Sequence, residues 1–294
     1  MKILFLARHK WPHVGGVETH VRELGKRLKI KGESVKIISE EDIRFPKIKY
    51  LGLLYIWFWL FKNRKLIKWA DIIHCHDVFI WYLPFRFLYS KKPVYTTFHG
   101  WEGTWPIPWR NIMHKRLASR LSWGTIAVGK YIEKYYGVKV SRIIYGGNDH
   151  LGGAKAHPRG VNRVSHNFRG VNHIVFVGRL EKDTGVLDFI EQLKINNLKF
   201  KTDFVGDGSL RKECEKFGKV HGFVDPNPFL EKADICVPGG YLSYIEAKSL
   251  GCKIKVFANN PLKIDYWVEI QKVKKFPTWG EIADEYISLY NSSK

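Results

Sequence analysis

The chain has 294 residues, enough for two domains that each bury a core of their own. Its four cysteines are widely spaced and form no Cys-x-x-Cys pair, which argues against a disulfide framework or a structural zinc site and favours a reducing compartment. The 49 basic and 28 acidic residues give a net charge of +21, so the composition favours an anionic partner.

Short apolar runs alternate with longer periodic ones along the whole chain. The first run, residues 3–6, follows Met1 almost directly and is too short for a signal peptide, so we expect it to be a buried strand. A helix is expected next, because Val17, Val21, Leu24 and Leu28 share one helical face, and Gly32 ends it. Further strands are expected at 35–38, 72–75, 94–98, 125–128, 142–145, 174–177, 200–205, 219–222, 235–237 and 254–257. This alternation predicts an α/β protein with two Rossmann-like domains, each a parallel sheet covered on both faces.

The domain boundaries follow from composition. Residues 151–172 are polar, rich in Gly, Arg and His, and lack a sustained apolar period, which is typical of a linker. We therefore expect an N-terminal domain over 1–150 and a second domain over 173–277. Residues 278–294 are predicted to form a C-terminal helix that could pack back on the N-terminal domain. Its apolar face would consist of Trp279, Ile282, Tyr286 and Tyr290.

Basic and aromatic residues gather between residues 44 and 131. This stretch has fifteen Lys or Arg against three acids, and it holds eight of the eleven tryptophans. Such a mixture is typical of proteins that bind an anionic membrane surface or a nucleic acid. Within it, residues 50–61 are the most apolar run, but a membrane-spanning helix needs about 20 apolar residues. This run is either a core helix or an interfacial segment, and its aromatic residues and flanking cations are what the second would show.

Four glycine turns are expected where a strand passes into a helix, the place where helix N-termini and bare backbone meet anionic ligands in α/β sheets. They are Gly15-Gly16, Gly178-Arg179, Gly206-Asp207-Gly208 and Pro238-Gly239-Gly240. One such turn is as well explained by tight packing alone. Together, the three turns in the second half and the matching one near the N-terminus suggest a nucleotide or nucleotide sugar held between two domains.

Individual side chains near these turns suit such a ligand. Arg179 could hold a diphosphate with paired hydrogen bonds, or form a structural salt bridge between the domains, and Lys182 could add a second cation. The N–H groups of residues 240–243 could bind a phosphate. Glu246 could accept the two ribose hydroxyls, or it could simply complement the helix dipole as an acid of the first turn.

Three histidines end predicted strands. His74 and His76 share a face and could bind a metal, but the sequence places no further ligand, so we expect no metal site. His99 follows its strand at the carboxyl edge of the sheet, where ligands bind in this class of fold. His99 is therefore the better site candidate.

Taken in order, these residues resemble the retaining glycosyltransferases of family 4, which have two facing Rossmann-like domains, the GT-B fold. The resemblance extends over nearly the whole chain. It rests on Gly15-Gly16-Val17-Glu18, Thr97-Phe98-His99, residues 144–149, Gly178-Arg179-Leu180, Gly206-Asp207-Gly208, Gly222-Phe223-Val224 and Glu246-Ala247.

The resemblance implies a UDP- or GDP-sugar donor, retention of anomeric configuration, no metal and no permanently bound cofactor. Arg179 would bind the diphosphate and help the nucleotide leave, and His99 would face the transferred sugar, so these two are the catalytic candidates. The other donor contacts would come from Gly15, Gly16, Lys182, Phe223, Val224, Gly240, Tyr241, Leu242, Ser243 and Glu246.

The sequence departs from the family at two positions. Thr184 stands directly before Gly185, where the family usually has a lysine. Pro238 stands where the family has the first glutamate of a pair, eight residues before Glu246, and proline cannot accept a hydrogen bond from a sugar hydroxyl through its side chain. The nucleotide half of the donor site is therefore the firmer prediction.

These features predict a glycosyltransferase that works as a peripheral protein at the cytoplasmic face of the inner membrane, on a lipid-linked or other anionic acceptor. One alternative is a catalytically silent relative or a protein that binds nucleic acid or another anionic surface, although no RNA-binding or helix-turn-helix motif is recognisable. The other alternative is a nucleotide-sugar epimerase on the same fold, which would consume the donor without any acceptor.

Overall fold

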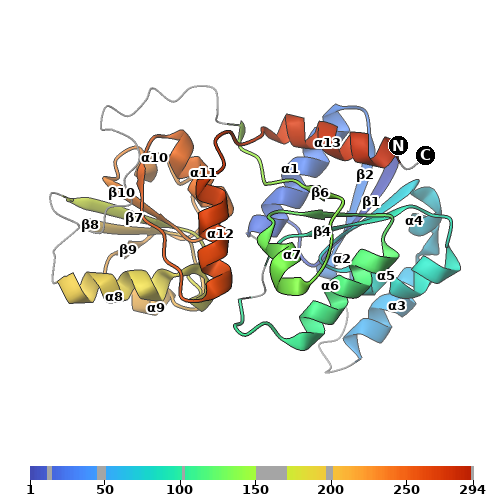
Figure 1. Cartoon of the computed structure of the whole chain (residues 1–294), viewed down its shortest axis with the longest axis horizontal. Coiled ribbons are helices and arrows are strands. Elements are labelled where there is room, and N and C mark those ends of the chain that lie inside the picture. Colours follow the sequence, from blue (N-terminus) through green and yellow to red (C-terminus); the bar gives the residue numbers. More distant parts are fainter. Residues whose placement is uncertain (12–14, 45–50, 101–102, 150–170, 197–200, 293–294) are drawn as a thin grey trace. The chain divides into compact units, whose positions relative to one another are not determined.

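The computed structural model describes residues 1–11, 15–44, 51–100, 103–149, 171–196 and 201–292 (Figure 1). Most of the predicted linker therefore lies outside the described residues. The chain divides into two compact units, which we describe one at a time. Unit 1 comprises Met1–Glu102, Pro106–Gly146 and Trp279–Lys294, and unit 2 comprises Gly103–Trp105 and Gly147–Thr278.

Unit 1 is built on a six-stranded parallel sheet in the order β2-β1-β3-β4-β5-β6. Apart from Lys2 at the start of β1, every residue of β1, β3, β4 and β5 is buried, as expected for a parallel sheet that is covered on both faces. The strands are β1 (Lys2–Ala7), β2 (Ser34–Ile38), β3 (Ile72–His76), β4 (Val94–Phe98), β5 (Gly124–Ala127) and β6 (Arg142–Ile143).

Helices cover both faces of this sheet (Figure 1). They are α1 (Gly16–Ile30), α2 (Glu40–Ile43), α3 (Gly52–Lys62), α4 (Arg64–Trp69), α5 (Phe79–Leu88), α6 (Trp109–Leu121), α7 (Tyr131–Tyr136) and α13 (Trp279–Asn291). In α1 the predicted face is buried at Val21, Leu24 and Leu28. The C-terminal helix α13 belongs to unit 1 and packs against α1, with Tyr286 and Tyr290 fully buried.

Unit 2 is built on a five-stranded parallel sheet in the order β11-β10-β7-β8-β9. Its strands are β7 (His173–Val177), β8 (Lys201–Val205), β9 (Lys219–Val220), β10 (Ile235–Pro238) and β11 (Lys253–Ile254). One face of the sheet packs Phe176 and Phe204 against Phe189, and the other face packs Val175 and Val205 against Ala247. The connecting helices are η2 (Lys182–Thr184), α8 (Val186–Asn196), α9 (Arg211–Cys214), α10 (Asn227–Leu230), α11 (Tyr241–Ser249) and α12 (Pro261–Gln271).

The structure confirms the predicted α/β class with two parallel sheets, but three strands are shorter than expected. The run 142–145 is a strand only as far as Ile143. The run 219–222 is a strand only as far as Val220, because Gly222 turns out of the extended conformation at φ +74°. The run 254–257 stops at Ile254, and the Phe257 carbonyl instead accepts a hydrogen bond from Trp267 Nε1 at 2.9 Å. All three differences lie at the end where the chain leaves the sheet.

Each sheet reverses its winding once. In unit 1 the chain passes from β1 to β2 on one side and returns to β3 on the other, and in unit 2 it passes from β7 to β8 and later returns to β10 on the other side of β7. Ligands of such open sheets bind at the carboxyl ends of the strands beside this switch point. A ligand-binding site is therefore expected at the carboxyl ends of β1 and β3 in unit 1, and of β7 and β10 in unit 2.

Candidate functional site

The glycines at the switch point of unit 2 serve two different purposes. Gly178 and Gly206 lie so close that a Cβ added to Gly206 would stand 1.9 Å from the Gly178 carbonyl oxygen, and both have positive φ values. These two glycines are required by the packing of the turns on one another. Gly240 differs, since its backbone is extended and a Cβ there would meet nothing within 4 Å. The space beside Gly240 is open to a ligand.

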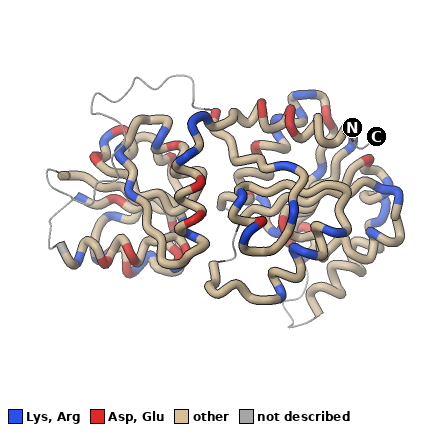
Figure 2. Tube along the Cα trace, viewed as in Figure 1, with Lys and Arg blue, Asp and Glu red and all other residues tan. Residues whose placement is uncertain are grey.

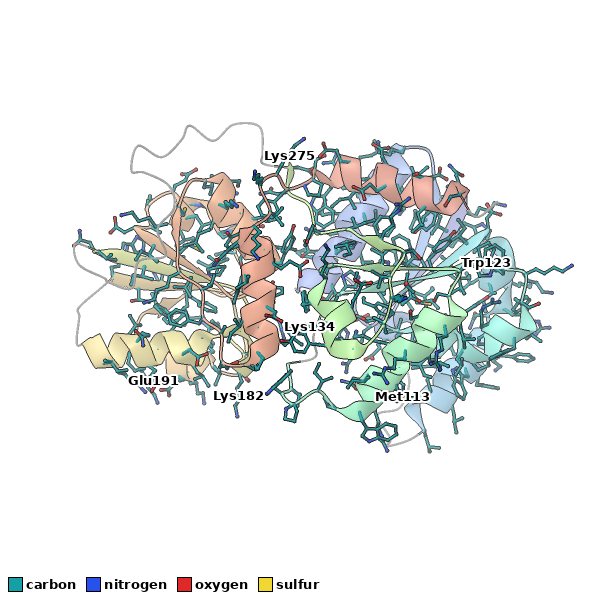
Figure 3. All side chains as sticks on the ribbon, in the orientation of Figure 1. Met113, Trp123, Lys134, Lys182, Glu191 and Lys275 are labelled. Carbon is teal, nitrogen blue, oxygen red and sulfur yellow. The ribbon has the colours of Figure 1, made fainter. Side chains whose placement is uncertain are left out.

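Arg179 stands at the end of β7 with its side chain 48% exposed, and its Nη2 donates to Asp183 Oδ2 at 2.9 Å. Both residues belong to the turn that leads from β7 into α8. One carboxylate accepts from only part of the guanidinium, so its other N–H groups could donate to an anion. Lys182 is exposed on the same turn (Figure 3). Thr184 is buried, and its hydroxyl donates to the Glu181 carbonyl at 2.8 Å, so this residue holds the turn together.

A buried cation that was not predicted from the sequence is Lys263, in the first turn of α12. Its side chain is buried, and its Nζ lies 4.8 Å from the ring centroid of Tyr266 and 5.4 Å from that of Trp267. Burial lowers the pKa of Lys263 to about 8, while Asp183 acts to raise it and Arg179 to lower it further. Within the described parts of the chain, the ammonium has no hydrogen bond or ion pair.

The available sequence signal for this lysine was Asn260-Pro261, a helix start directly after the last strand. In the structure the Asn260 side chain caps α12 by accepting from the Lys263 backbone N–H at 2.9 Å. The preceding loop packs against the turn that follows β7, because a Cβ added to Gly185 would meet Phe257 Cβ at 3.0 Å. This packing brings the start of α12 beside Arg179 and Asp183.

Glu246 is a mostly buried acid with no partner among the described residues. Burial, together with the negative charge of Asp225, raises its pKa to about 7. No side-chain hydrogen bond or ion pair reaches its carboxylate from any residue that the structure describes. Glu246 is the sixth residue of α11, beyond the first turn in which an acid complements the helix dipole, so that explanation does not fit.

The loop after β9 lies near Glu246, since its Asp225 acts on the Glu246 carboxylate. The same loop exposes two apolar side chains, Phe223 and Val224. An exposed apolar pair next to a buried acid could bind the flat base and the ribose of a nucleoside. The residues predicted to contact base and ribose are thus brought to one region of unit 2.

The start of α11 offers backbone donors, as predicted for residues 240–243, but not all of them are free. The Gly240 N–H is directed to Ser243 Oγ at 3.3 Å, and the Ser243 hydroxyl donates back to the Gly240 carbonyl at 3.0 Å. The backbone of Tyr241 hydrogen-bonds to the Tyr266 hydroxyl. The N–H groups of Leu242 and Ser243 remain as the donors of the first helical turn that could meet a phosphate.

In unit 1, His99 lies at the carboxyl edge among other histidines. Its backbone N–H donates to Asp77 Oδ2 at 2.9 Å, and its Nε2 lies 2.9 Å from Nδ1 of His76. The His20 ring packs edge-on against it with centroids 4.7 Å apart. Burial, followed by the charges of His20, His74 and Lys115, holds the pKa of His99 well below its usual value. His99 is therefore a neutral imidazole at neutral pH.

Behind His99, a buried network joins the sheet to α13. His74 Nδ1 lies 2.5 Å from the Tyr290 hydroxyl and its Nε2 lies 2.7 Å from Thr97 Oγ1. Tyr286 connects Thr97, at 3.0 Å, with Nε2 of His20, at 3.2 Å. Among the described residues, no three or more His, Cys, Asp or Glu side chains are grouped as metal ligands. Both ring nitrogens of His74 and Nε2 of His20 are used in hydrogen bonds, whereas Nε2 of His76 is buried with no partner among the described residues.

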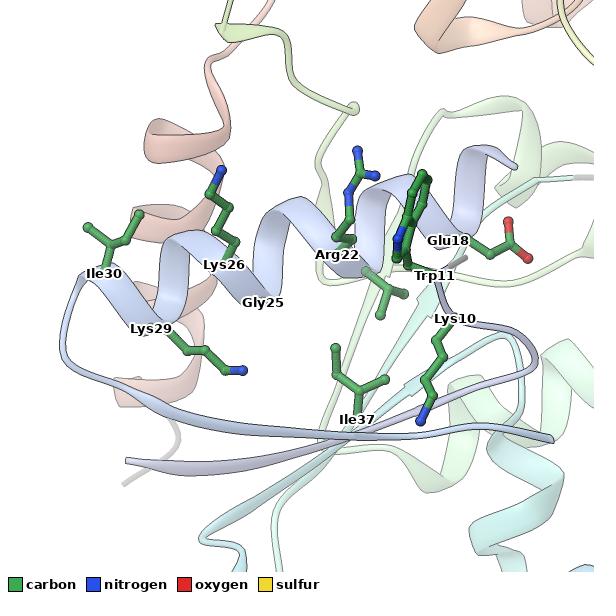
Figure 4. A pocket seen from close by; sticks show the side chains of 10 residues that line it. Lys10, Trp11, Glu18, Arg22, Gly25, Lys26, Lys29, Ile30 and Ile37 are labelled. Carbon is green, nitrogen blue, oxygen red and sulfur yellow. The ribbon is translucent and has the colours of Figure 1, made fainter. Parts of the chain in front are cut away.

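The Gly15-Gly16 turn caps α1 and leaves its backbone accessible at Gly16, where a Cβ would meet nothing within 4 Å. A groove runs from this end of α1 along its outer face (Figure 4). In it Arg22 lies over the Trp11 ring, 4.7 Å from its centroid. The groove is lined by α1, β2 and the segment after β1 and does not include His99.

Comparisons with known proteins agree with this architecture. Residues 14–149 match the family described as Glycosyltransferase Family 4. Over 239 residues the chain is 27% identical to an uncharacterized glycosyltransferase of Methanocaldococcus jannaschii, a match that covers 74% of this chain and 63% of the relative. The chain therefore spans less than two thirds of that relative's length.

Solved structures share the fold over almost the whole chain. The Anabaena protein HepE in complex with UDP and glucose superposes with a TM-score of 0.64 and 18% identity, covering 99% of this chain and 90% of HepE. The UDP-GlcNAc 2-epimerase of Neisseria meningitidis, bound to UDP-GlcNAc, superposes with a TM-score of 0.57 and 14% identity, covering 99% and 100%. The family match covers less than half of the chain, and the solved structures share its fold of two parallel-sheet α/β domains, the GT-B fold.

Proposed function

We propose that this protein transfers a hexosyl group from a nucleotide-diphosphate sugar to an acceptor hydroxyl. The observation that carries the proposal is the composition of the carboxyl edge of unit 2. There, the switch point between β7 and β10 combines two cations, Arg179 and Lys263, with an open helix start and with Glu246, an acid to which the described part of the chain offers no partner. A nucleoside diphosphate supplies what each of these groups needs: an anion for the cations and hydroxyl donors for the acid.

The donor contacts follow from these positions. Arg179 and Lys263 bind the diphosphate, with Lys182 nearby on the same turn as Arg179, and the N–H groups at the start of α11 bind a phosphate oxygen. Glu246 accepts hydrogen bonds from the ribose hydroxyls, and Phe223 with Val224 contacts the base. UDP is the preferred nucleotide, since structures of the same fold hold UDP or a UDP-sugar, and GDP is the alternative.

The proposed chemistry needs no metal and no permanently bound cofactor, because the two cations can stabilise the charge that develops on the leaving diphosphate. The bond between the anomeric carbon and the phosphate oxygen breaks, and the acceptor oxygen bonds to that carbon on the same face, which retains the configuration. The acceptor proton passes to the departing phosphate. In unit 1 we assign neutral His99 to hydrogen bonding with the transferred sugar, and Gly15 and Gly16 to a bare backbone that a sugar or phosphate can approach.

We further propose a lipid-linked or other anionic acceptor, used at the cytoplasmic face of a membrane. The excess of basic and aromatic residues in unit 1 supports this choice. Among the described residues, none of the helices has the length and apolar character needed to cross a bilayer.

A nucleotide-sugar epimerase remains a second candidate, because the Neisseria enzyme of the same fold is one. Incubating the protein with UDP-glucose, UDP-galactose, UDP-GlcNAc and GDP-mannose, with and without a membrane lipid extract, separates the two. Transfer predicts that UDP or GDP is released and the sugar appears in the lipid fraction only when the extract is present. Epimerisation predicts a changed sugar on intact donor without the extract.

Arg179→Ala is expected to abolish the transfer. Arg211→Ala on the neighbouring helix α9 is a matched control, because its guanidinium already pairs with Asp207 and Glu215 at 2.8 Å each. Binding of a nucleotide without turnover of any donor would identify a catalytically silent relative. Binding of nucleic acid with no response to any nucleotide would refute the proposal.

A further inference from the structure

Helix α3 carries an apolar face that no described residue of unit 1 covers. Its inner side is buried through Ile56 and Leu60, and Trp57 fixes it to α5 by donating from Nε1 to the Ile80 carbonyl at 2.9 Å. On the outer side Leu54, Phe58 and Phe61 follow one another at helical spacing and are each more than half exposed. A surface helix of a soluble protein normally carries polar residues there.

Helix α6 extends this apolar surface. Trp109, 69% exposed, and Met113 lie in its first two turns, and Met113 points away from the body of the unit (Figure 3). Both α3 and α6 pack against α5. We call Leu54, Phe58, Phe61, Trp109 and Met113 the docking face. Because helices run antiparallel to the strands in this fold, the starts of α3 and α6 lie towards the carboxyl edge of the sheet.

The helices around the docking face carry charge of one sign. Helices α3, α4, α5 and α6 contain no Asp or Glu, and Figure 2 shows Lys and Arg along them. Several cations lie over the aromatic rings, with Lys62 Nζ 5.1 Å from the Phe58 centroid and Arg64 Cζ 5.1 Å from the Phe61 centroid. The exposed cations of α3, α4 and α6 are Lys62, Arg64, Lys65, Lys68, Arg110, Arg116 and Arg120.

We infer that the docking face binds to an anionic lipid bilayer. Aromatic and aliphatic side chains would insert at the level of the headgroups, and the cations around them would meet lipid phosphates. With 11 residues, α3 is about 16 Å long, roughly half the hydrocarbon thickness, so it lies in the interface and does not span it. The inference rests on the proposed function and deepens it. Docking would hold the carboxyl edge of unit 1, where His99 lies, near the membrane surface that contains a lipid-linked acceptor.

The same charges argue against the other possible occupants. A second copy docked through the same face would bring the cations of both copies together with no acid between them, which is unfavourable. A protein partner would need an acidic surface rimming an apolar one, and a bilayer with anionic headgroups presents that combination over any area.

Co-sedimentation with phosphatidylcholine vesicles, with and without phosphatidylglycerol, tests the inference. Wild type should bind the anionic vesicles and release them as NaCl is raised. Arg64→Gln combined with Lys65→Gln should weaken binding about 30-fold, at about fivefold per cation. Phe58→Ser and Trp109→Ser should each weaken it about tenfold or more. As controls in unit 2, exposed Lys232→Gln combined with Lys272→Gln, and exposed Ile195→Ser, should leave binding unchanged.

Three results would overturn the docking face: no binding of wild type to anionic vesicles, equal salt-independent binding to both vesicle types, or equal loss in the face and control variants. Sedimentation velocity tests whether a second copy occupies the face. A wild-type dimer that Phe58→Ser abolishes and the control variants keep would assign the docking face to a second copy. Thermal stabilisation by UDP, measured on every variant, reports folding and donor binding separately. If wild type binds vesicles but is not stabilised by UDP, the proposed donor site is wrong and the membrane inference is supported. If UDP stabilises wild type but vesicles do not bind, the donor site is supported and the membrane inference is wrong.

Discussion

The buried histidine network of unit 1 predicts that acid destabilises this unit. Burial holds the pKa of both His20 and His74 at about 3 in the folded protein, against about 6.5 in the unfolded chain. The stability that each neutral imidazole contributes is complete above about pH 6.5 and is lost as the pH falls below that value, because the unfolded chain then takes up the proton. Lowering the pH to about 5.5 should cost about 1.4 kcal/mol for each, or about 3 kcal/mol for the two.

Urea unfolding followed by tryptophan fluorescence measures this loss, since every tryptophan except Trp105 and Trp267 belongs to unit 1. Between about pH 6 and pH 4, His20→Gln should lower the slope of unfolding free energy against pH by about 1.4 kcal/mol per pH unit, one proton's worth. Tyr286→Phe is the matched control: it removes the hydroxyl bonded to His20 and Thr97, and should lower stability without changing the slope. A wild-type stability that does not fall between about pH 7.5 and pH 5.5 would refute the reasoning.

Three further predictions concern unit 2. Lys263→Met should weaken UDP binding about tenfold or more. The UDP affinity of wild type, measured by calorimetry, should fall as the pH rises through about 8, because Lys263 then loses its proton. Lys263→Arg should show no such fall, because a guanidinium stays charged. Glu246→Gln should raise the unfolding free energy at about pH 8 by about 2–3 kcal/mol, because a buried carboxylate with a raised pKa destabilises the fold above that pKa. The same variant should bind UDP more weakly. If it binds UDP as wild type does, the assignment of Glu246 to the ribose is wrong. Gly206→Ala should lower the unfolding free energy by about 2–3 kcal/mol, because the added Cβ clashes with the Gly178 carbonyl. Gly240→Ala should keep the wild-type melting temperature and lose UDP affinity. Equal melting temperatures for the two variants would show that the glycines do not differ as described.

The sequence was sufficient to predict the fold because its signals were local and repeated. Strands such as β1 and β4 are buried apolar runs, and the periodic face of α1 is visible without any tertiary information. The strand ends were less predictable. At Gly222 the backbone turns out of β9 through a conformation that a β-branched run alone does not reveal.

The candidate site was predictable where it follows the strand ends and obscure where it depends on packing. Arg179 and Glu246 could be chosen from their positions after β7 and β10. Lys263 could not, because its burial and its place beside Arg179 depend on how the loop after β11 packs on Gly185. The histidine network was hidden for the same reason, since Tyr286 and Tyr290 reach His20 and His74 from the far end of the chain.

The apolar run at 50–61 shows a third case. Its sequence allowed a core helix or an interfacial segment, and the structure contains elements of both. Ile56 and Leu60 are buried, whereas Leu54 and Phe58 on the other side of α3 are exposed. Periodicity could not separate these faces, because both are apolar.

The proposed function requires that the carboxyl edge of unit 2 binds a nucleoside diphosphate through Arg179. The most direct measurement is a thermal-shift panel of UDP-, GDP- and ADP-sugars against wild type, Arg179→Ala and the control Arg211→Ala. We predict that at least one nucleotide sugar, with UDP preferred, raises the melting temperature of wild type and of Arg211→Ala, and that Arg179→Ala loses the shift. If no nucleotide raises the melting temperature of wild type, or if Arg179→Ala responds as wild type does, the claim is wrong.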